Sequence, residues 1–349
     1  MSDAASLAAK DVALDAMGGD HAPAEIVAGA VQAAREFAAS IILTGPAEQV
    51  RAELAKHDTA GLDITIEDAP ELVAMDEHPS DSLKKKNSSM AVAVRLVKEG
   101  RASAAISAGN SGAMMAAALF GLGRIRGIDR PGLGIPFPTQ KGQCLVIDVG
   151  ANADCRPQHL VQFALMGSVY AERVYGIANP RIGIVSIGEE EGKGNQLVKD
   201  AYPLLKEAAG LAGLNFIGNI EGKDIPGGGA DVVVCDGYTG NVVLKLSEGL
   251  ARMILELVRD AAYTNLRSKI GGALLKPALD AKRARLDWRE TGGSLLMGLR
   301  GVALIGHGRS DARAVRSAIK TARQIVASKP TEVIAEGMAK IGALAKVEG

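Results

Sequence analysis

Aromatic side chains are scarce in this sequence, at 3% of its 349 residues, so the hydrophobic core must be built mainly from aliphatic side chains. The 3 cysteines are too few and too widely spaced for a disulfide framework or a zinc site, which favours a reducing cytoplasm. Positive and negative side chains balance to a formal net charge of zero, so we do not expect nucleic acid to bind through bulk charge.

Long hydrophobic runs are missing as well. No run approaches the roughly 20 apolar residues that a membrane span needs, and the first residues lack the basic and apolar regions of a secretory signal. The patterns G-x-x-x-x-G-K-[ST], for phosphate, and H-E-x-x-H, for metal, are absent, and no G-x-G-x-x-G follows the first strand. We therefore expect no cofactor, no metal and no membrane-spanning segment, although the protein could still lie on a membrane.

Alternating strand and helix patterns predict an α/β fold. Short aliphatic runs such as VALD and SIILTG are each followed by a helical pattern, with helices expected near residues 25–37, 47–56 and 90–98. This alternation is typical of βαβ units, and it predicts three α/β/α layers around a mainly parallel sheet. We expect a flexible N-terminus at 1–10, a single catalytic domain at 11–330 and a helical tail at 331–349.

Residues 241–289 break this alternation, because they contain no strand pattern. A helical stripe runs through their first half, at Leu250, Met253, Ile254, Leu257, Val258 and Ala261. Gly271 and Gly272 predict a turn, and a second helical pattern follows them. One interpretation is a helical hairpin that protrudes from the sheet, and the other is two ordinary packed helices.

Asp15 ends the first apolar run and is followed by Gly18 and Gly19. Small or Asx/Ser residues also follow other predicted strands, at Ser107, Gly109, Asn110 and Ser111; at Asp148, Gly150 and Asn152; at Ser186, Lys193 and Asn195; and at Asp236, Gly237, Gly240 and Asn241. Because carboxyl ends of parallel strands share one edge of a sheet, we expect these loops to meet there. Their N–H groups and the helix N-termini behind them could cradle a phosphate. For any single loop the alternative is a tight turn or a helix cap.

Longer motifs give the chain a family resemblance. They are, in order, DAMGGDHAP, KKKNSSM, SAGNSGA, GRIRGIDRPGL, IDVGANADCRPQHLVQFA, SIGEEEGKGN, DGYTGNVVLK and HGRSDARAV. Over roughly residues 12–326 the chain resembles the bacterial phosphate acyltransferases. The resemblance implies an isopropylmalate-dehydrogenase-like fold, a homodimer and no organic cofactor. It implies a reaction of long-chain acyl-carrier-protein thioester with inorganic phosphate, whose acyl phosphate product a membrane glycerol-3-phosphate acyltransferase uses for phospholipid synthesis.

Such a reaction needs a cation and N–H donors where negative charge develops. Lys193, in a glycine-flanked loop, matches the active-site lysine that the resemblance implies, and Asn241 is the second candidate catalytic residue. The predicted substrate and phosphate site consists of Asp15, Gly18, Gly19, Ser88, Ser107, Gly109, Asn110, Ser111, Asp148, Asn152, Asn195 and Asp236. Since carboxylates repel phosphate, we expect the aspartates to orient donors or cap helices. Taken alone, Lys193 could equally be a solvated loop residue.

Several alternatives stay open at the level of sequence. Relatives commonly carry an arginine where this chain has Lys84, which leaves the role of Lys84–Lys86 undecided. Asp236 and His21 are alternative proton carriers, and Cys155 is the candidate nucleophile if catalysis is covalent. Alternative functions are a phosphotransacetylase for short-chain coenzyme A thioesters, a dehydrogenase of the same fold, and a non-catalytic scaffold between carrier protein and membrane.

The second half of the 241–289 excursion combines apolar and cationic side chains. Ile270, Ala273, Leu274 and Ala278 recur at helical spacing, and cations surround them at Arg267, Lys269, Lys276, Lys282, Arg283 and Arg285. Such a face suits an anionic membrane surface, and it equally suits an acidic carrier protein. The apolar stripe of the first half would be covered by the equivalent helix of a homodimer.

Overall fold

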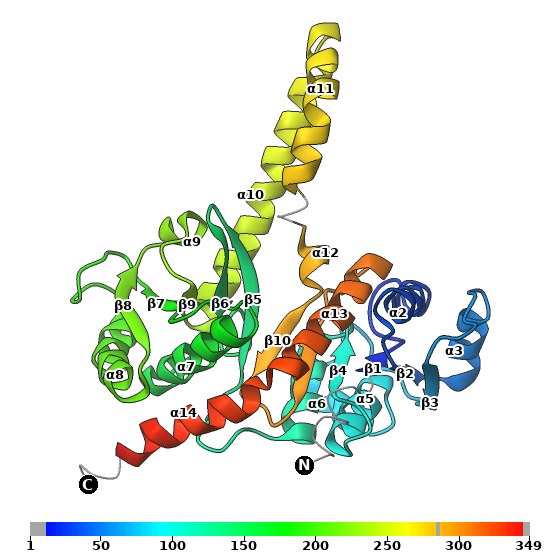
Figure 1. The fold of residues 1–349 in the computed structure, drawn as a ribbon, viewed down its shortest axis with the longest axis horizontal. Coiled ribbons are helices and arrows are strands. Elements are labelled where there is room, and N and C mark those ends of the chain that lie inside the picture. The colour runs from blue at the N-terminus through cyan, green and yellow to red at the C-terminus, as the bar shows by residue number, and fades with distance from the viewer. Residues whose placement is uncertain (1–11, 284–286, 345–349) are drawn as a thin grey trace.

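One sheet with helices on both faces forms the body of the molecule in the computed structural model, which describes residues 12–283 and 287–344 (Figure 1). Within these residues the strands are β1 (Val12–Asp15), β2 (Ile41–Gly45), β3 (Ile64–Asp68), β4 (Ala104–Ser107), β5 (Gly132–Thr139), β6 (Gly142–Ile147), β7 (Arg181–Val185), β8 (Asn215–Ile220), β9 (Val232–Val234), β10 (Ser294–Met297) and β11 (Val302–Ile305). The helices are α2 (Ala24–Phe37), α3 (Ala47–Leu54), α4 (Pro79–Ser82), α5 (Ser89–Lys98), α6 (Ser111–Leu122), α7 (Pro157–Arg173), α8 (Gln196–Ala212), α9 (Asp224–Gly227), α10 (Gly237–Tyr263), α11 (Leu266–Arg283), α12 (Trp288–Thr291), α13 (Ala312–Ser328) and α14 (Pro330–Leu344).

The strand residues alternate between two hydrophobic layers, as the period of two requires. Leu14 and Ile106 pack with α2, α7, α8, α13 and α14 on one face of the sheet. Their neighbours Ala13 and Ala105 pack with α5 and α6 on the other face, where α9 and α10 cover the strands further along. The expected α/β/α layers are therefore confirmed, and aliphatic side chains dominate both faces.

The sheet consists of two parallel blocks that run in opposite directions. Its strand order is β3-β2-β1-β4-β11-β10-β5-β6-β9-β7-β8. The first block, β3 to β11 in this order, is parallel throughout, and so is the second block, β6 to β8. Between them, β10 pairs antiparallel with β11 and with β5, and β5 pairs antiparallel with β6. Three reversals in a row turn the second block around, so the expectation that all strand-end loops meet at one edge is wrong.

The two connecting strands explain this error, because the alternation of strand and helix patterns does not reveal them. β5 has the sequence GLGIPFPT, whose glycines and prolines are typical of a loop. Pro136 and Pro138 lie beyond the part of β5 that pairs with β10, where a missing N–H costs no ladder hydrogen bond to that strand. β10, with the sequence SLLM, is followed by β11 with no helix between them, so it does not fit the alternation of strands and helices.

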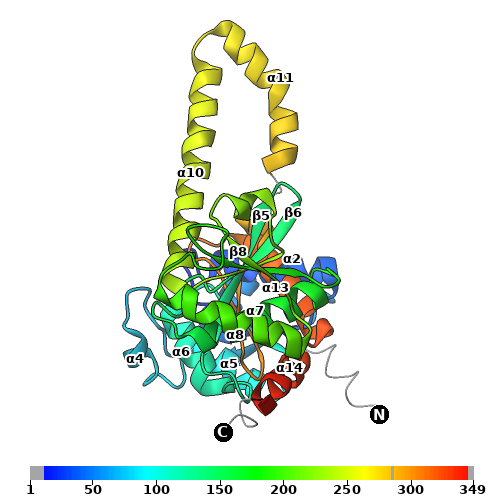
Figure 2. The same ribbon diagram turned by 90° about the vertical axis from the view of Figure 1, so that its left-hand side faces the viewer.

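Helices α10 and α11 leave the body of the molecule as a hairpin, which confirms the protruding interpretation (Figures 1 and 2). The expected turn at Gly271–Gly272 is wrong, because α11 runs through both glycines and the chain turns just before Leu266. Asn265 caps α11, its side-chain oxygen accepting a hydrogen bond of 2.9 Å from Ser268 N. A Cβ on Gly272 would lie 2.8 Å from the Cβ of Ala262, so this glycine lets the two helices approach closely.

The apolar stripe of the hairpin is left exposed by the other residues that the structure describes. Leu250, Ile254 and Leu257 of α10 are about half exposed, and so are Ile270 and Leu275 of α11. Among the described helices, none combines the length and the apolarity that crossing a membrane requires.

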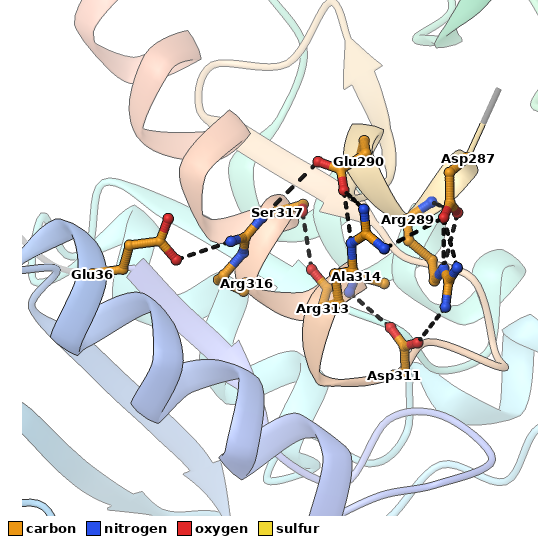
Figure 3. A network of polar contacts seen from close by, with 9 residues as sticks. All are labelled: Glu36, Asp287, Arg289, Glu290, Asp311, Arg313, Ala314, Arg316 and Ser317. Atoms are coloured by element: carbon orange, nitrogen blue, oxygen red, sulfur yellow. Dashed lines mark hydrogen bonds and ion pairs between the residues drawn. The ribbon is translucent and has the colours of Figure 1, made fainter. Parts of the chain in front are cut away.

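A network of charges fastens the returning chain to the body (Figure 3). Arg289 of α12 binds Asp287 at 2.6 Å and reaches Asp311, at the start of α13, at 3.2 Å. Further along α13, Arg316 binds Glu36 of α2 at 2.9 Å. Isolated surface pairs contribute little stability, but a connected set holds α12, α13 and α2 in register.

The segment 331–349, expected as a helical tail, forms α14 over Pro330–Leu344. Ile334 and Met338 are buried in the layer that contains α7, so this helix is packed onto the body. Residues 345–349 lie outside the described part of the chain, as do the expected flexible residues 1–10.

Candidate active site

The first group of predicted site residues gathers at the carboxyl ends of β1 and β4. Ser107 Oγ donates to Asp15 Oδ2 at 2.6 Å, and the Met17 N–H donates to Asp15 Oδ1 at 3.1 Å. The Gly109 N–H in turn donates to Ser107 Oγ at 3.1 Å. A Cβ on Gly18 would lie 2.5 Å from Asp15 Oδ2, so only glycine fits against this carboxylate. The two loops are thus closed onto one another around Asp15.

Asp15 is 1% exposed, and burial raises the pKa of its carboxyl group above the ordinary value. The hydrogen bonds from Ser107 and Met17 act in the opposite direction but are weaker than burial. Their geometry makes Asp15 an orienting group for the loops. Further along, Gly19 has a φ of +113°, a conformation that favours glycine, and borders the loop after β11.

The second group lies at the carboxyl end of β6, around Asp148. This buried carboxylate accepts hydrogen bonds from the backbone N–H groups of Leu133, Gly150, Ala151 and Asn152, at 2.7 to 3.2 Å. The Asn152 side-chain amide adds a fifth, at 2.9 Å. With every lone pair engaged, Asp148 shapes the loop after β6 and leaves no acceptor for a ligand.

Asp236 and α10 complete the second group. Asp236 caps α10, with its Oδ1 accepting from Thr239 N at 2.8 Å. A Cβ on Gly240 would lie 1.9 Å from the carbonyl oxygen of Asp148, so the first turn of α10 packs directly on the loop after β6. Asn241 follows, exposed and close to Gly150. The N-terminus of α10, with its positive end, therefore opens beside an exposed amide.

Three other predicted phosphate ligands serve as helix caps. Ser88 caps α5, Asn110 caps α6 and Asn195 caps α8, each through its side-chain oxygen. The Asn110 amide also donates to the carbonyl oxygen of Glu77 at 2.8 Å. Ser111, the first residue of α6, is exposed. These three side-chain oxygens already accept hydrogen bonds from helix N–H groups. An anion at these loops would therefore bind to the helix N-termini.

Lys193 lies in the loop that joins β7 to α8 and is exposed. Its side chain passes over Gly188, where a Cβ would lie 3.1 Å from Lys193 Cγ. Within the described residues its ammonium group forms no hydrogen bond or ion pair, and Glu191 of the same loop binds Lys206 at 3.4 Å. A cation without a carboxylate partner is available to an anionic ligand.

Helix α10 links the two groups, because its exposed face continues from Asn241 to Lys245 and Glu248. These two side chains, with Arg309 and Asp20, lie close enough to His307 to affect its charge. Burial, followed by Arg309 and Lys245, lowers the pKa of His307 below its ordinary 6.5, which favours a neutral ring.

His307 and Lys245 are residues that sequence reasoning did not assign to the site. His307 lies in the loop after β11, whose last residue Ile305 lies opposite Ser107 of β4, and the Gly306 N–H donates to the Ser107 carbonyl oxygen at 2.8 Å. The Asp20 N–H donates to the Gly308 carbonyl oxygen at 2.7 Å. The strand-end pattern would have found His307 had it been extended to the last strand.

Two of the open alternatives lose support. Burial raises the pKa of the Cys155 thiol to about 12, which disfavours the thiolate that a nucleophile needs. His159 does not pair with Cys155, since its Nδ1 accepts from Arg156 N at 3.1 Å. Lys84 binds Asp81 at 2.7 Å and is mostly exposed, so its charge is balanced within its own segment.

Within the described residues, no group of three or more His, Cys, Asp or Glu side chains is arranged to hold a metal ion. His21 is exposed in the turn that precedes α2.

Comparisons with known proteins agree on one family. Residues 10–333 match the family model described as "Fatty acid synthesis protein". "Phosphate acyltransferase" from Pelotomaculum thermopropionicum is 49% identical over 331 residues, which are 95% of each chain. "Phosphate acyltransferase" from Heliobacterium modesticaldum is 52% identical over 318 residues, 90% of this chain and 93% of the relative.

Solved structures share the fold at low sequence identity. EutD phosphotransacetylase from Staphylococcus aureus has a TM-score of 0.61 and 15% identity, covering 93% of this chain and 98% of its own. A phosphotransacetylase from Streptococcus pyogenes has a TM-score of 0.63 and 19% identity, covering 91% and 94%. The family match and the identities near one half together show that the chain belongs to the phosphate acyltransferase family and is an acyltransferase.

Proposed function

We propose that this chain transfers a long-chain fatty acyl group from acyl-carrier-protein thioester to inorganic phosphate. An oxygen of hydrogen phosphate attacks the thioester carbonyl carbon, and the carbon–sulfur bond breaks. The proton of the phosphate passes to the departing thiolate, so the products are acyl phosphate and free carrier protein. The names of the relatives support phosphate as the acceptor.

The observation that carries the proposal is Lys193, exposed in a loop at the carboxyl end of β7, whose ammonium group has no partner among the described residues. Negative charge is present on phosphate and develops on the thioester oxygen, and a fixed cation stabilises both. Asn241, beside the N-terminus of α10, adds an amide donor for the same oxygens. Asp15, Asp148 and Asp236 support the site by shaping its loops.

The identity of the acyl donor can be tested by comparing two thioesters. Purified protein is incubated with phosphate and either palmitoyl-acyl-carrier protein or acetyl-coenzyme A, and acyl phosphate is trapped with hydroxylamine. The proposal predicts product from the carrier-protein thioester at a rate far above that from acetyl-coenzyme A. The reverse preference would make the chain a short-chain phosphotransacetylase, and no product from either donor would favour a non-catalytic scaffold.

We further propose that the hairpin meets a second copy of the chain and a membrane. The α10 stripe around Leu250 and Ile254 would be covered by its equivalent in a homodimer.

The turn exposes Tyr263 and Leu266, the latter by 74%, next to Arg267 and Lys269. Exposed apolar side chains beside cations suit an anionic bilayer. A cytoplasmic enzyme held there could pass its poorly soluble product to a membrane glycerol-3-phosphate acyltransferase. Of the cations expected on this face, Lys282, Arg283 and Arg285 have side chains outside the described part of the structure.

Flotation with anionic vesicles tests the membrane contact. Wild-type protein should float, and Leu266→Glu should not, while both remain dimeric by gel filtration. Leu72→Glu, a change at an exposed leucine far from the hairpin in sequence, is the matched control and should float. If wild-type protein stays at the bottom at low salt, the tip is not a membrane element, and docking of the acidic carrier protein becomes the better use for its charge.

A further inference from the structure

Asn219 of β8 holds the turn that carries Lys193. Its side chain is 6% exposed, and its Nδ2 donates to the carbonyl oxygen of Glu190 at 2.7 Å and to that of Lys193 at 3.4 Å. The Lys193 N–H donates to the Glu190 carbonyl oxygen at 2.9 Å, which closes the turn. One buried amide therefore contacts the carbonyl groups at both ends of the turn.

The other end of this amide is unsatisfied. Among the residues that the structure describes, Asn219 Oδ1 is buried without a hydrogen-bond partner, and so is Ser186 Oγ. A Cβ on Gly194 would lie 3.1 Å from Ser186 Oγ, so Ser186 lies directly under the residue that follows Lys193. A buried oxygen without a partner costs free energy, and an apolar side chain at position 219 would avoid that cost for the strand. What the asparagine contributes in exchange is its contact with the turn.

Little else in the loop fixes Lys193. Gly188, Gly192 and Gly194 flank it, and Gly194 has a φ of +118°, so the backbone is permissive on both sides. The ammonium group has no partner among the described residues. Its position therefore depends on the backbone of the Glu190–Lys193 turn.

We propose that Asn219 is a positioning residue that fixes, through this turn, where the Lys193 ammonium meets phosphate or the thioester oxygen. The inference rests on the proposed function, in which Lys193 supplies the charge that the reaction needs. Asn219 is buried beneath the loop and acts on the reaction only through Lys193. A cation that is held in place stabilises developing charge better than one that must first be ordered.

A double-mutant cycle tests this action through Lys193. Asn219→Ala and Asn219→Leu, the second of which fills the space without a donor, should each lower the kcat for acyl phosphate formation about tenfold, the effect of one lost hydrogen bond. Adding either change to Lys193→Ala should lower the rate no further, because the group being positioned is gone. The matched control is Asn215→Ala at the other end of β8, whose amide donates to the Asn179 carbonyl oxygen, and it should stay within about twofold of wild type.

Hydrogen exchange supplies a readout that does not depend on activity. The Lys193 amide, bonded to the Glu190 carbonyl, should exchange faster in Asn219→Ala and unchanged in Asn215→Ala. Two results would overturn this inference but leave the proposed function standing. One is full activity of the folded Asn219 variants while Lys193→Ala is impaired. The other is a double variant in which the two losses of rate multiply. If wild-type protein makes no acyl phosphate, the proposed function fails first and this inference falls with it.

Discussion

Replacing Gly240 with alanine tests how closely α10 must pack on the loop after β6. The new Cβ would lie 1.9 Å from the Asp148 carbonyl oxygen and 3.0 Å from Cys235 Sγ. Ordinary contacts begin near 3.4 Å, so the helix or the loop must move by roughly 1.5 Å. Overpacking of this kind destabilises a protein by about 1–3 kcal/mol, and the upper end applies here because the obstacle is backbone.

The same change should impair activity, because Asn241 is the next residue. A displacement of about 1 Å at a catalytic group costs on the order of 10²-fold in rate. Gly249→Ala in the same helix is the matched control, since a Cβ there meets nothing within 4 Å. It should raise stability by up to about 1 kcal/mol through helix propensity and leave the rate unchanged.

Urea unfolding followed by circular dichroism, together with the rate of acyl phosphate formation, measures both effects. Gly240→Ala should unfold at lower urea than wild type, and Gly249→Ala at equal or higher urea. The packing argument would be refuted if Gly240→Ala matched wild type in both unfolding midpoint and rate.

Three further changes follow from the same structure. Because the pKa of His307 is lowered, the folded protein favours the neutral ring, so stability should fall as the pH drops below 6.5. His307→Gln should flatten that decline in urea titrations between about pH 7 and pH 5. Cys155→Ser should keep at least about half of the activity, since the pKa near 12 leaves the thiol un-ionised; a stoichiometric acyl-enzyme on Cys155 in mass spectra would contradict this. Gly272→Leu should loosen the hairpin, because even a Cβ would lie 2.8 Å from Ala262, and faster proteolysis near the turn would report it, whereas an unchanged digest would count against the close packing.

The helices and most strands could be predicted from the sequence because their hydrophobic periods are strong. The observed α2 and α5 begin within a residue of their predicted positions. β5 and β10 could not be predicted in this way, since β5 is rich in proline and glycine and β10 is joined to β11 without a helix between them. These two strands reverse the second block of the sheet, so local pattern could not say which strand ends share an edge.

The candidate site also combines features that the sequence suggests with features that only the structure reveals. Residue types at strand ends predicted a ligand site at Asp15, Ser107 and Asp148, and the structure places these side chains in hydrogen bonds within the protein. Whether an Asn or Ser caps a helix or is available to a ligand depends on which N–H groups lie nearby, and a single sequence does not reveal that. The buried amide of Asn219 is a clearer case, because it acts on a turn that is distant in the chain.

Transfer of labelled phosphate tests the central claim most directly. Wild-type protein and Lys193→Ala are each mixed with long-chain acyl-carrier protein and ³²P-phosphate, and labelled acyl phosphate is measured over time. The account predicts rapid labelling by wild type and a rate lower by roughly 10²–10³ in the variant, as expected for the loss of one group that stabilises developing charge. Equal labelling by the two proteins would show that Lys193 is only a solvated loop residue, and no labelling by wild type would contradict acyl transfer to phosphate itself.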